Sequence, residues 1–198
     1  MKLKIGITGG IGSGKSYVCH LLEGLGGIPV YYCDDEAKRL NVESPIIREK
    51  LTALVGPQVY LADGSLNKPA LIAYLFASQE HARKVNAIVH PVVLQDFLDW
   101  TERQETRMVA LEAALLFEAG YQDKLDCSVL VTAPEELRIE RIIQRDCTTV
   151  ELAQQRIRVQ SSDEEKKQLA DFVIQNDEVT PLEEQIERLL AYLRNKIL

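Results

Sequence analysis

The stretch Gly9-Gly10-Ile11-Gly12-Ser13-Gly14-Lys15-Ser16 decides the fold of this chain, because it matches the phosphate-binding pattern G-x-x-x-x-G-K-[S/T]. The apolar residues 3–8 before it predict a buried strand, and apolar residues recur at helical spacing from Tyr17 to Leu25 behind it. A strand that turns tightly into a helix aims backbone N–H groups and the helix dipole at an anion. We therefore expect this loop to hold the phosphates of a nucleotide.

The residue types of the loop predict how a nucleoside triphosphate is held. Its glycines permit backbone angles that a Cβ would resist, so that successive amides curl around a phosphate. Lys15 is expected to reach the β- and γ-phosphates, and Ser16 to offer its hydroxyl to Mg²⁺. The alternative is a glycine-rich turn that binds nothing, although a chance match is expected in roughly one chain in a hundred of this length. The expected nucleotide-binding residues are Gly9, Gly10, Ile11, Gly12, Ser13, Gly14, Lys15, Ser16 and Tyr17.

Composition indicates an ordinary globular protein and excludes some partners. With a net charge of −7 over 198 residues, a surface that coats nucleic acid is not expected, although local Arg and Lys can still focus a small anion. The four cysteines show neither C-x-x-C pairing nor a matched His spacing, which favours free thiols in a reducing compartment. The opening residues lack a signal-peptide pattern, and no apolar run approaches membrane-spanning length. We expect a cytoplasmic protein without membrane or nucleic-acid partners, either a monomer or a weak homo-oligomer.

Alternating strand and helix patterns predict a three-layer α/β/α fold with a parallel five-stranded sheet. Residues 36–103 instead show consecutive helical patterns, which we interpret as a helical insertion beside the sheet. Residues 138–165 are expected to form a helical lid. The nucleotide-binding core then comprises residues 1–35, 104–137 and 166–198, with strands at residues 3–8, 28–32, 107–112, 126–131 and 172–174.

Local signals predict where the later helices begin. Pro134 is expected at the first position of one helix, and residues 148–151 are expected to form the capping box of the next. The polar residues 161–168 are interpreted as solvated surface. A last helix is expected to begin at Thr180 and to pack through Leu182, Ile186, Leu189, Leu193 and Ile197.

An acidic pair, Asp34 and Asp35, follows the second expected strand, at the sheet edge where open α/β folds place their chemistry. Asp34 is the candidate to accept a proton from an attacking hydroxyl or to hold Mg²⁺ through water. The alternative is that either aspartate only caps the helix that follows. Glu112, at the end of an apolar strand, is a weaker candidate for the acidic partner of the metal, and Glu118 is weaker still.

Arginines are spaced along one expected helix. Arg141 and Arg145 lie four residues apart and are predicted to close over the triphosphate, like arginine fingers supplied in cis. Arg156 and Arg158 of the next helix could join them. Arg138 is interpreted as a solvated side chain that pairs with neighbouring glutamates.

Taken in order, the motifs resemble those of the dephospho-CoA kinase family over nearly the whole chain. Asp34 stands where the family motif D-x-D-x-x-A-R has its second aspartate. The sequence departs from the family pattern at Tyr17, Tyr32, Lys38 and Ala114, and Tyr32 argues against any role that needs two carboxylates on that strand. The other matching segments are residues 7–16, 62–66 (ADGSL), 86–91 (NAIVHP), 115–118 (LLFE), 141–146 (RIIQRD), 156–160 and 170–176.

The resemblance implies a P-loop kinase that moves the γ-phosphate of ATP to the ribose 3′-hydroxyl of dephospho-CoA. Asp34 would be the base, Lys15 and Ser16 with Mg²⁺ would hold ATP, and Arg141 and Arg145 would steady the transferring group. Asn86 and His90 would help to hold the CoA arm, although a lone histidine is more often structural.

Three alternatives to this function stay open. A nucleoside or nucleotide kinase of the same fold would carry the same phosphate loop. A GTP-binding switch would need an N-K-x-D motif, which the nearest segment, residues 175–178, does not supply. A nucleotide sensor without turnover is disfavoured by the intact Lys15, Ser16 and Asp34.

Overall fold

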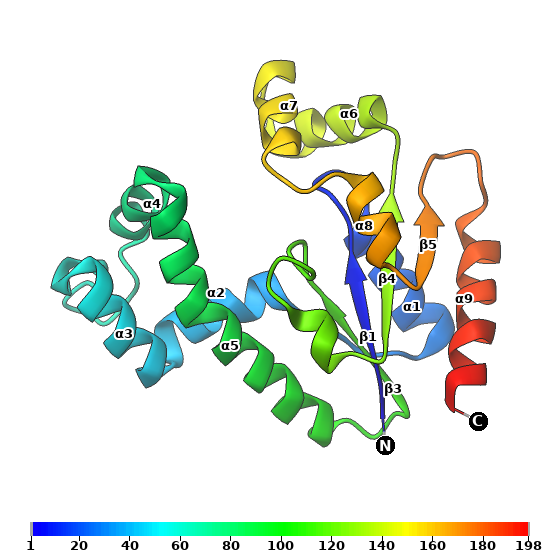
Figure 1. Ribbon diagram of the computed structural model, residues 1–198, viewed down its shortest axis with the longest axis horizontal. Coiled ribbons are helices and arrows are strands. Elements are labelled where there is room, and N and C mark those ends of the chain that lie inside the picture. Colours follow the sequence, from blue (N-terminus) through cyan, green and yellow to red (C-terminus); the bar gives the residue numbers. More distant parts are fainter. Residues whose placement is uncertain (1, 198) are drawn as a thin grey trace. The chain divides into compact units, whose positions relative to one another are not determined.

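A five-stranded sheet in the order β2-β3-β1-β4-β5 carries the phosphate loop (Figure 1). The central strand β1 pairs in parallel with β3 and β4, and β4 pairs in parallel with β5. The predicted parallel five-stranded sheet is therefore confirmed. The strands are β1 (Leu3–Thr8), β2 (Val30–Tyr32), β3 (Met108–Glu112), β4 (Cys127–Thr132) and β5 (Phe172–Gln175).

The computed structural model describes residues 2–197, which divide into two compact units. The first unit consists of Met1–Tyr31 and Gln104–Leu198, and the second is Tyr32–Arg103. Besides most of the sheet, the first unit contains α1 (Lys15–Gly26), α6 (Glu135–Asp146), α7 (Val150–Arg158), α8 (Asp163–Leu169), α9 (Leu182–Ile197) and the 3₁₀ turn Tyr121–Lys124. The second unit is helical, with α2 (Cys33–Glu43), α3 (Pro45–Val55), α4 (Lys68–Ala77), α5 (Gln79–Arg103) and the 3₁₀ turn Pro57–Val59.

The core of the first unit lies on both faces of the sheet. Helices α1 and α9 pack together on one face, and α8 covers β4 on the other (Figure 1). Ile5 and Ile7 of β1 and Val129 of β4 are fully buried, as expected for parallel strands that are covered on both sides. This burial holds β1 rigidly and therefore fixes where the loop that follows it begins.

Several predicted boundaries are wrong by one or two residues, and one interpretation is wrong in kind. Pro134 is the N-cap of α6 and not its first helical residue, with φ −53° and ψ 143°. Thr149, not Thr148, caps α7 by accepting a hydrogen bond from the Leu152 amide. The capping box lies instead at Ser162 and Glu165, so the polar residues 161–168 begin the helix α8.

The last helix begins two residues later than predicted, at Leu182. Its buried face includes Ile186, Leu189 and Leu193, whereas Leu182 is only partly buried. The side chain of Ile197 lies outside the described residues.

Candidate active site

The phosphate loop is shaped by two glycines in the left-handed region. Gly12 has φ 80° and Gly14 has φ 87°, which residues with a Cβ rarely adopt. A Cβ on Gly12 would lie 2.6 Å from the carbonyl oxygen of Arg138, and one on Gly14 would collide with the Asn176 amide. Both glycines are therefore required by conformation and by the close approach of α6 and of the segment after β5.

Asn176 ties the loop to the end of the sheet. Its backbone N–H donates to the Thr132 carbonyl at 2.8 Å, which continues the pairing of β4 and β5. Its buried side-chain Nδ2 donates to the Ser13 carbonyl at 2.8 Å. The loop closes on itself through the Ser13 amide, which donates to the Gly10 carbonyl at 3.0 Å. These hydrogen bonds hold the loop in shape.

Lys15 of the loop forms a buried ion pair with Glu112 at the end of β3. The Lys15 Nζ lies 3.1 Å from a Glu112 carboxylate oxygen, and the two side chains are 13% and 7% exposed. Burial, followed by the nearby Glu112 charge, raises the pKa of the Cys19 thiol, so this neighbour stays protonated. The Lys15 charge thus compensates the charge of the buried Glu112 carboxylate.

Arg141 reaches the loop, whereas Arg145 pairs within its own helix. The Arg141 NH1 donates to the Gly12 carbonyl at 3.4 Å and to the Ser13 carbonyl at 3.5 Å. Its NH2 donates to the Asn176 carbonyl at 3.2 Å and to Glu178 at 3.0 Å. Arg145 is 61% exposed and donates to Asp146 at 2.7 Å and 3.0 Å. Hydrogen bonding from Arg145, together with Arg156, holds the pKa of Asp146 below its usual value.

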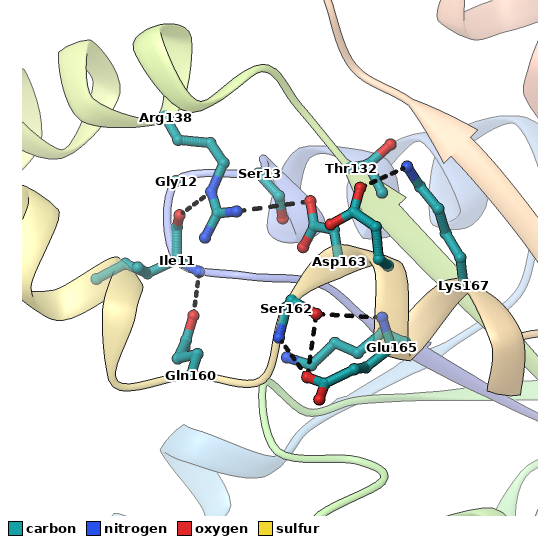
Figure 2. A network of polar contacts seen from close by, with 12 residues as sticks. Ile11, Gly12, Ser13, Thr132, Arg138, Gln160, Ser162, Asp163, Glu165 and Lys167 are labelled. Carbon is teal, nitrogen blue, oxygen red and sulfur yellow. Dashed lines mark hydrogen bonds and ion pairs between the residues drawn. The ribbon is translucent and has the colours of Figure 1, made fainter.

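Arg138 is buried, so its interpretation as a solvated side chain is wrong. Its Nε donates to the Ile11 carbonyl at 2.9 Å, and its NH1 lies 3.5 Å from an Asp163 oxygen (Figure 2). The Ile11 amide in turn donates to the Gln160 side chain at 2.8 Å. Glutamates near Arg138 in the sequence suggested a solvated helix face, but Arg138 packs on the glycine loop and is buried there.

Glu118 and Lys166 link the segment after β3 to α8. Lys166 is 1% exposed and its Nζ lies 3.5 Å from a Glu118 oxygen, which also accepts a hydrogen bond from the Ser161 hydroxyl at 2.8 Å. The spacing of Ser162 and Glu165 fits a capping box and could have predicted the start of α8 from the sequence. Glu118 is thus committed to contacts within the first unit.

The two aspartates of the second unit differ in what they contact. Both lie inside the first turn of α2, whose N-cap is Tyr32 with no side-chain cap bond, so the capping alternative is wrong. Asp35 pairs with Lys38 at 2.7 Å, which raises the pKa of Lys38. Within residues 2–197, no hydrogen bond or ion pair engages the exposed Asp34 carboxylate. Asp34 is therefore the less engaged of the two carboxylates, although its charge also helps to raise the pKa of Lys38.

Asn86 and His90 lie one turn apart on α5, and therefore on the same face of that helix. His90 is half-buried, and burial lowers its pKa below the usual value, which favours the neutral ring. Pro91 follows inside the helix and supplies no N–H to the carbonyl of Ala87. Pro91 therefore removes one hydrogen bond from the helical ladder at this point of α5.

A cavity of about 610 Å³ lies at the carboxyl ends of β4 and β5, beside Arg138. Its lining mixes cationic side chains such as Arg138 and Lys167 with anionic ones such as Asp163 and Glu164. Among the described residues, no helix has the length and apolarity to cross a membrane, and no group of three or more metal-binding side chains comes together.

Comparison with known proteins identifies the family. Residues 3–191 match the family model described as dephospho-CoA kinase. A dephospho-CoA kinase from Bacteroides fragilis is 50% identical over all of this chain and 96% of its own length. The crystal structure of TT1252 from Thermus thermophilus aligns with a TM-score of 0.82 at 35% identity, covering 100% of this chain and 98% of that one. A dephospho-CoA kinase from Campylobacter jejuni, at 22% identity with both chains fully covered, shares the fold with a TM-score of 0.69.

Proposed function

This chain belongs to the dephospho-CoA kinase family, and we propose that it transfers the γ-phosphate of ATP to the ribose 3′-hydroxyl of dephospho-CoA, giving CoA and ADP, the last step of coenzyme A synthesis. The observation that carries this proposal is a family match over residues 3–191 in a chain whose phosphate loop and Asp34 are intact.

ATP is proposed to bind the loop of residues 9–16, with the amides of Ser16 and Tyr17 on the α-phosphate. The Lys15–Glu112 ion pair supports a mechanism in which Lys15 exchanges its partner when ATP binds. Lys15 would turn to the β- and γ-phosphates and release the Glu112 carboxylate. Because the pair is buried, separating its two charges costs free energy that the phosphate contacts of Lys15 would offset.

Ser16 and Glu112 carry oxygen donors of the kind that Mg²⁺ prefers, and we propose that they help to hold the ion. Mg²⁺ keeps several of its waters and binds through one or two protein oxygens together with substrate phosphates, so a cluster of several carboxylates is not required. Ser16 is exposed in the first turn of α1, directly after Lys15. Bound there, the ion would neutralise charge on the β- and γ-phosphate oxygens.

Asp34 is proposed to accept the proton of the attacking 3′-hydroxyl, since its carboxylate is exposed and uncommitted. Arg141 and Arg145 are proposed to neutralise charge on the transferring phosphoryl group, Arg145 after leaving Asp146. The helical residues 36–103, including Asn86 and His90, are proposed to hold the CoA arm. Residues 138–165 are proposed to act as a lid that excludes water, because water would otherwise take the phosphoryl group.

We further propose a cytoplasmic location and a monomer or weak homo-oligomer. The four free cysteines support a reducing compartment.

Coupled ADP release tests the function. The chain is given ATP and Mg²⁺ alone, then with dephospho-CoA, adenosine or a nucleoside monophosphate. The proposal expects rapid ADP release with dephospho-CoA only. Preferred turnover of a nucleoside or nucleotide would retain the phosphate loop and reject the acceptor.

A further inference from the structure

Both backbone groups of Ile11 in the phosphate loop are held from outside the loop. The Ile11 N–H donates to Gln160 at 2.8 Å, and the Ile11 C=O accepts from the Arg138 Nε at 2.9 Å. Figure 2 shows Gln160 and Arg138 approaching Ile11 from the α7–α8 connection and from α6. Two successive peptide planes of the loop are therefore clamped by the segment proposed as a lid.

The two hydrogen bonds from Gln160 and Arg138 to Ile11, together called the clamp, also set the orientation of loop groups that they do not contact. In a trans peptide the C=O and the following N–H point in opposite directions. Holding the Ile11 C=O toward Arg138 therefore turns the Gly12 N–H the opposite way. Holding the Ile11 N–H toward Gln160 likewise turns the Gly10 C=O the opposite way, where it accepts the Ser13 amide at 3.0 Å.

Arg138 is itself held in place by its surroundings. Its side chain is 8% exposed, its carbonyl lies against Gly12, and its NH1 lies 3.5 Å from Asp163 in the first turn of α8. Arg138 thus joins the loop to α6 and α8. Because it is buried against the backbone, small movements of either helix change the orientation of the Ile11–Gly12 peptide.

We propose that Arg138 is a positioning residue, whose Nε–H holds the Ile11–Gly12 peptide so that the Gly12 N–H faces the nucleotide phosphates. It acts as a hydrogen-bond donor to the loop and not as a charge on the phosphates. The inference rests on one part of the proposed function, the binding of ATP by the loop, and not on the identity of the acceptor.

Glutamine provides a sharp test, because its Nε2 is bonded to Cδ in the same way as the Nε of arginine. Arg138→Gln keeps a donor at that position and loses the guanidinium charge. Removing Arg138 alone would strand the Asp163 carboxylate, so each variant also carries Asp163→Asn. The matched pair is then Arg138→Gln/Asp163→Asn and Arg138→Leu/Asp163→Asn, which differ in the donor.

Binding of ADP and of a non-hydrolysable ATP analogue is measured by calorimetry, which needs no acceptor. The leucine variant is expected to bind about 10- to 100-fold more weakly, as for one lost hydrogen bond to a charged group, while the glutamine variant stays within about threefold of the parent. The KM for dephospho-CoA is expected to change by less than about twofold in both, since the positioned amide faces ATP. Arg188→Gln is the control, because Arg188 also donates its Nε to a backbone carbonyl, on the exposed surface of α9.

Equal affinity in the glutamine and leucine variants would overturn the proposal. Arg138→Lys has a methylene where Nε stands and keeps the charge. If the lysine variant retained nucleotide affinity and the glutamine variant lost it, Arg138 would act through its charge on the phosphates and not by positioning the loop. This comparison remains decisive if the leucine variant does not fold. Failure of turnover with intact nucleotide binding would instead count against the proposed acceptor and leave Arg138 unaffected.

Discussion

Replacing Asn176 by leucine tests whether the phosphate loop is held in shape by the sheet. The change keeps the approximate size of the side chain and removes the buried hydrogen bond of 2.8 Å from Nδ2 to the Ser13 carbonyl. The Ser13 carbonyl would keep only the long contact of 3.5 Å from Arg141 NH1, and Arg141 would lose its acceptor Asn176 Oδ1. The loss of these buried hydrogen bonds is expected to cost about 1–3 kcal/mol. For a chain of this size each kcal/mol lowers Tm by roughly 2–4 °C, so we expect a loss of about 2–12 °C by calorimetry.

The same variant should weaken nucleotide binding. The Ser13 carbonyl and the Gly14 N–H belong to one peptide, so a carbonyl held less firmly also loosens an amide that is expected to face phosphate. We expect an ATP affinity at least about tenfold lower, measured by titration. Asn195→Leu, on the exposed surface of α9, is the control. An Asn176→Leu variant with unchanged Tm and unchanged ATP affinity would refute the reasoning.

Three further predictions concern Asp34, His90 and the cysteines. The Asp34→Asn variant should keep the Tm and the ATP affinity of the parent chain, while the rate of phosphoryl transfer falls by about 10²–10⁴-fold because a general base is lost. Transfer is measured by ADP release. An unchanged rate would assign the general base to another residue, with Glu112 as the next candidate. Burial lowers the pKa of His90, so the unfolded chain binds its proton more readily, and stability should fall as pH drops below about 6.5. Urea unfolding of His90→Gln should show a smaller loss of stability at acid pH than unfolding of the parent chain. An equal loss would exclude His90 as the cause of the pH dependence. A thiol reagent should modify Cys147 quickly, since it is exposed, while Cys127 stays protected because burial raises its pKa to about 11. Rapid modification of more than one thiol in the folded chain would contradict the burial of the others.

The sequence predicts the phosphate loop well because its signal is local. The backbone angles at Gly12 and Gly14 are a property of a short segment, and the strand before it and the helix after it have clear apolar periodicity. The order of the elements predicted the parallel sheet, because a strand, a helix and a next parallel strand have one favoured handedness. These features could be derived without any long-range contact.

The clamp on the loop could not be predicted in the same way. Arg138 contacts Ile11, which is 127 positions earlier in the chain, and its neighbouring glutamates resemble those of an exposed helix. Helix α8 was missed because its polar residues suggest solvated surface, although one of them, Lys166, is buried beside Glu118. The sequence also does not reveal that Lys15 pairs with Glu112, because the two residues meet only when β1 and β3 are neighbours.

The most direct test of the proposed function follows the phosphoryl group itself. The chain is incubated with ATP labelled on its γ-phosphate, Mg²⁺ and dephospho-CoA, and the product is characterised by mass spectrometry and phosphorus NMR. The account predicts CoA with the label on the ribose 3′-oxygen, formed in equal amount to ADP. Label that appears only in inorganic phosphate, or on another acceptor in place of dephospho-CoA, would contradict it.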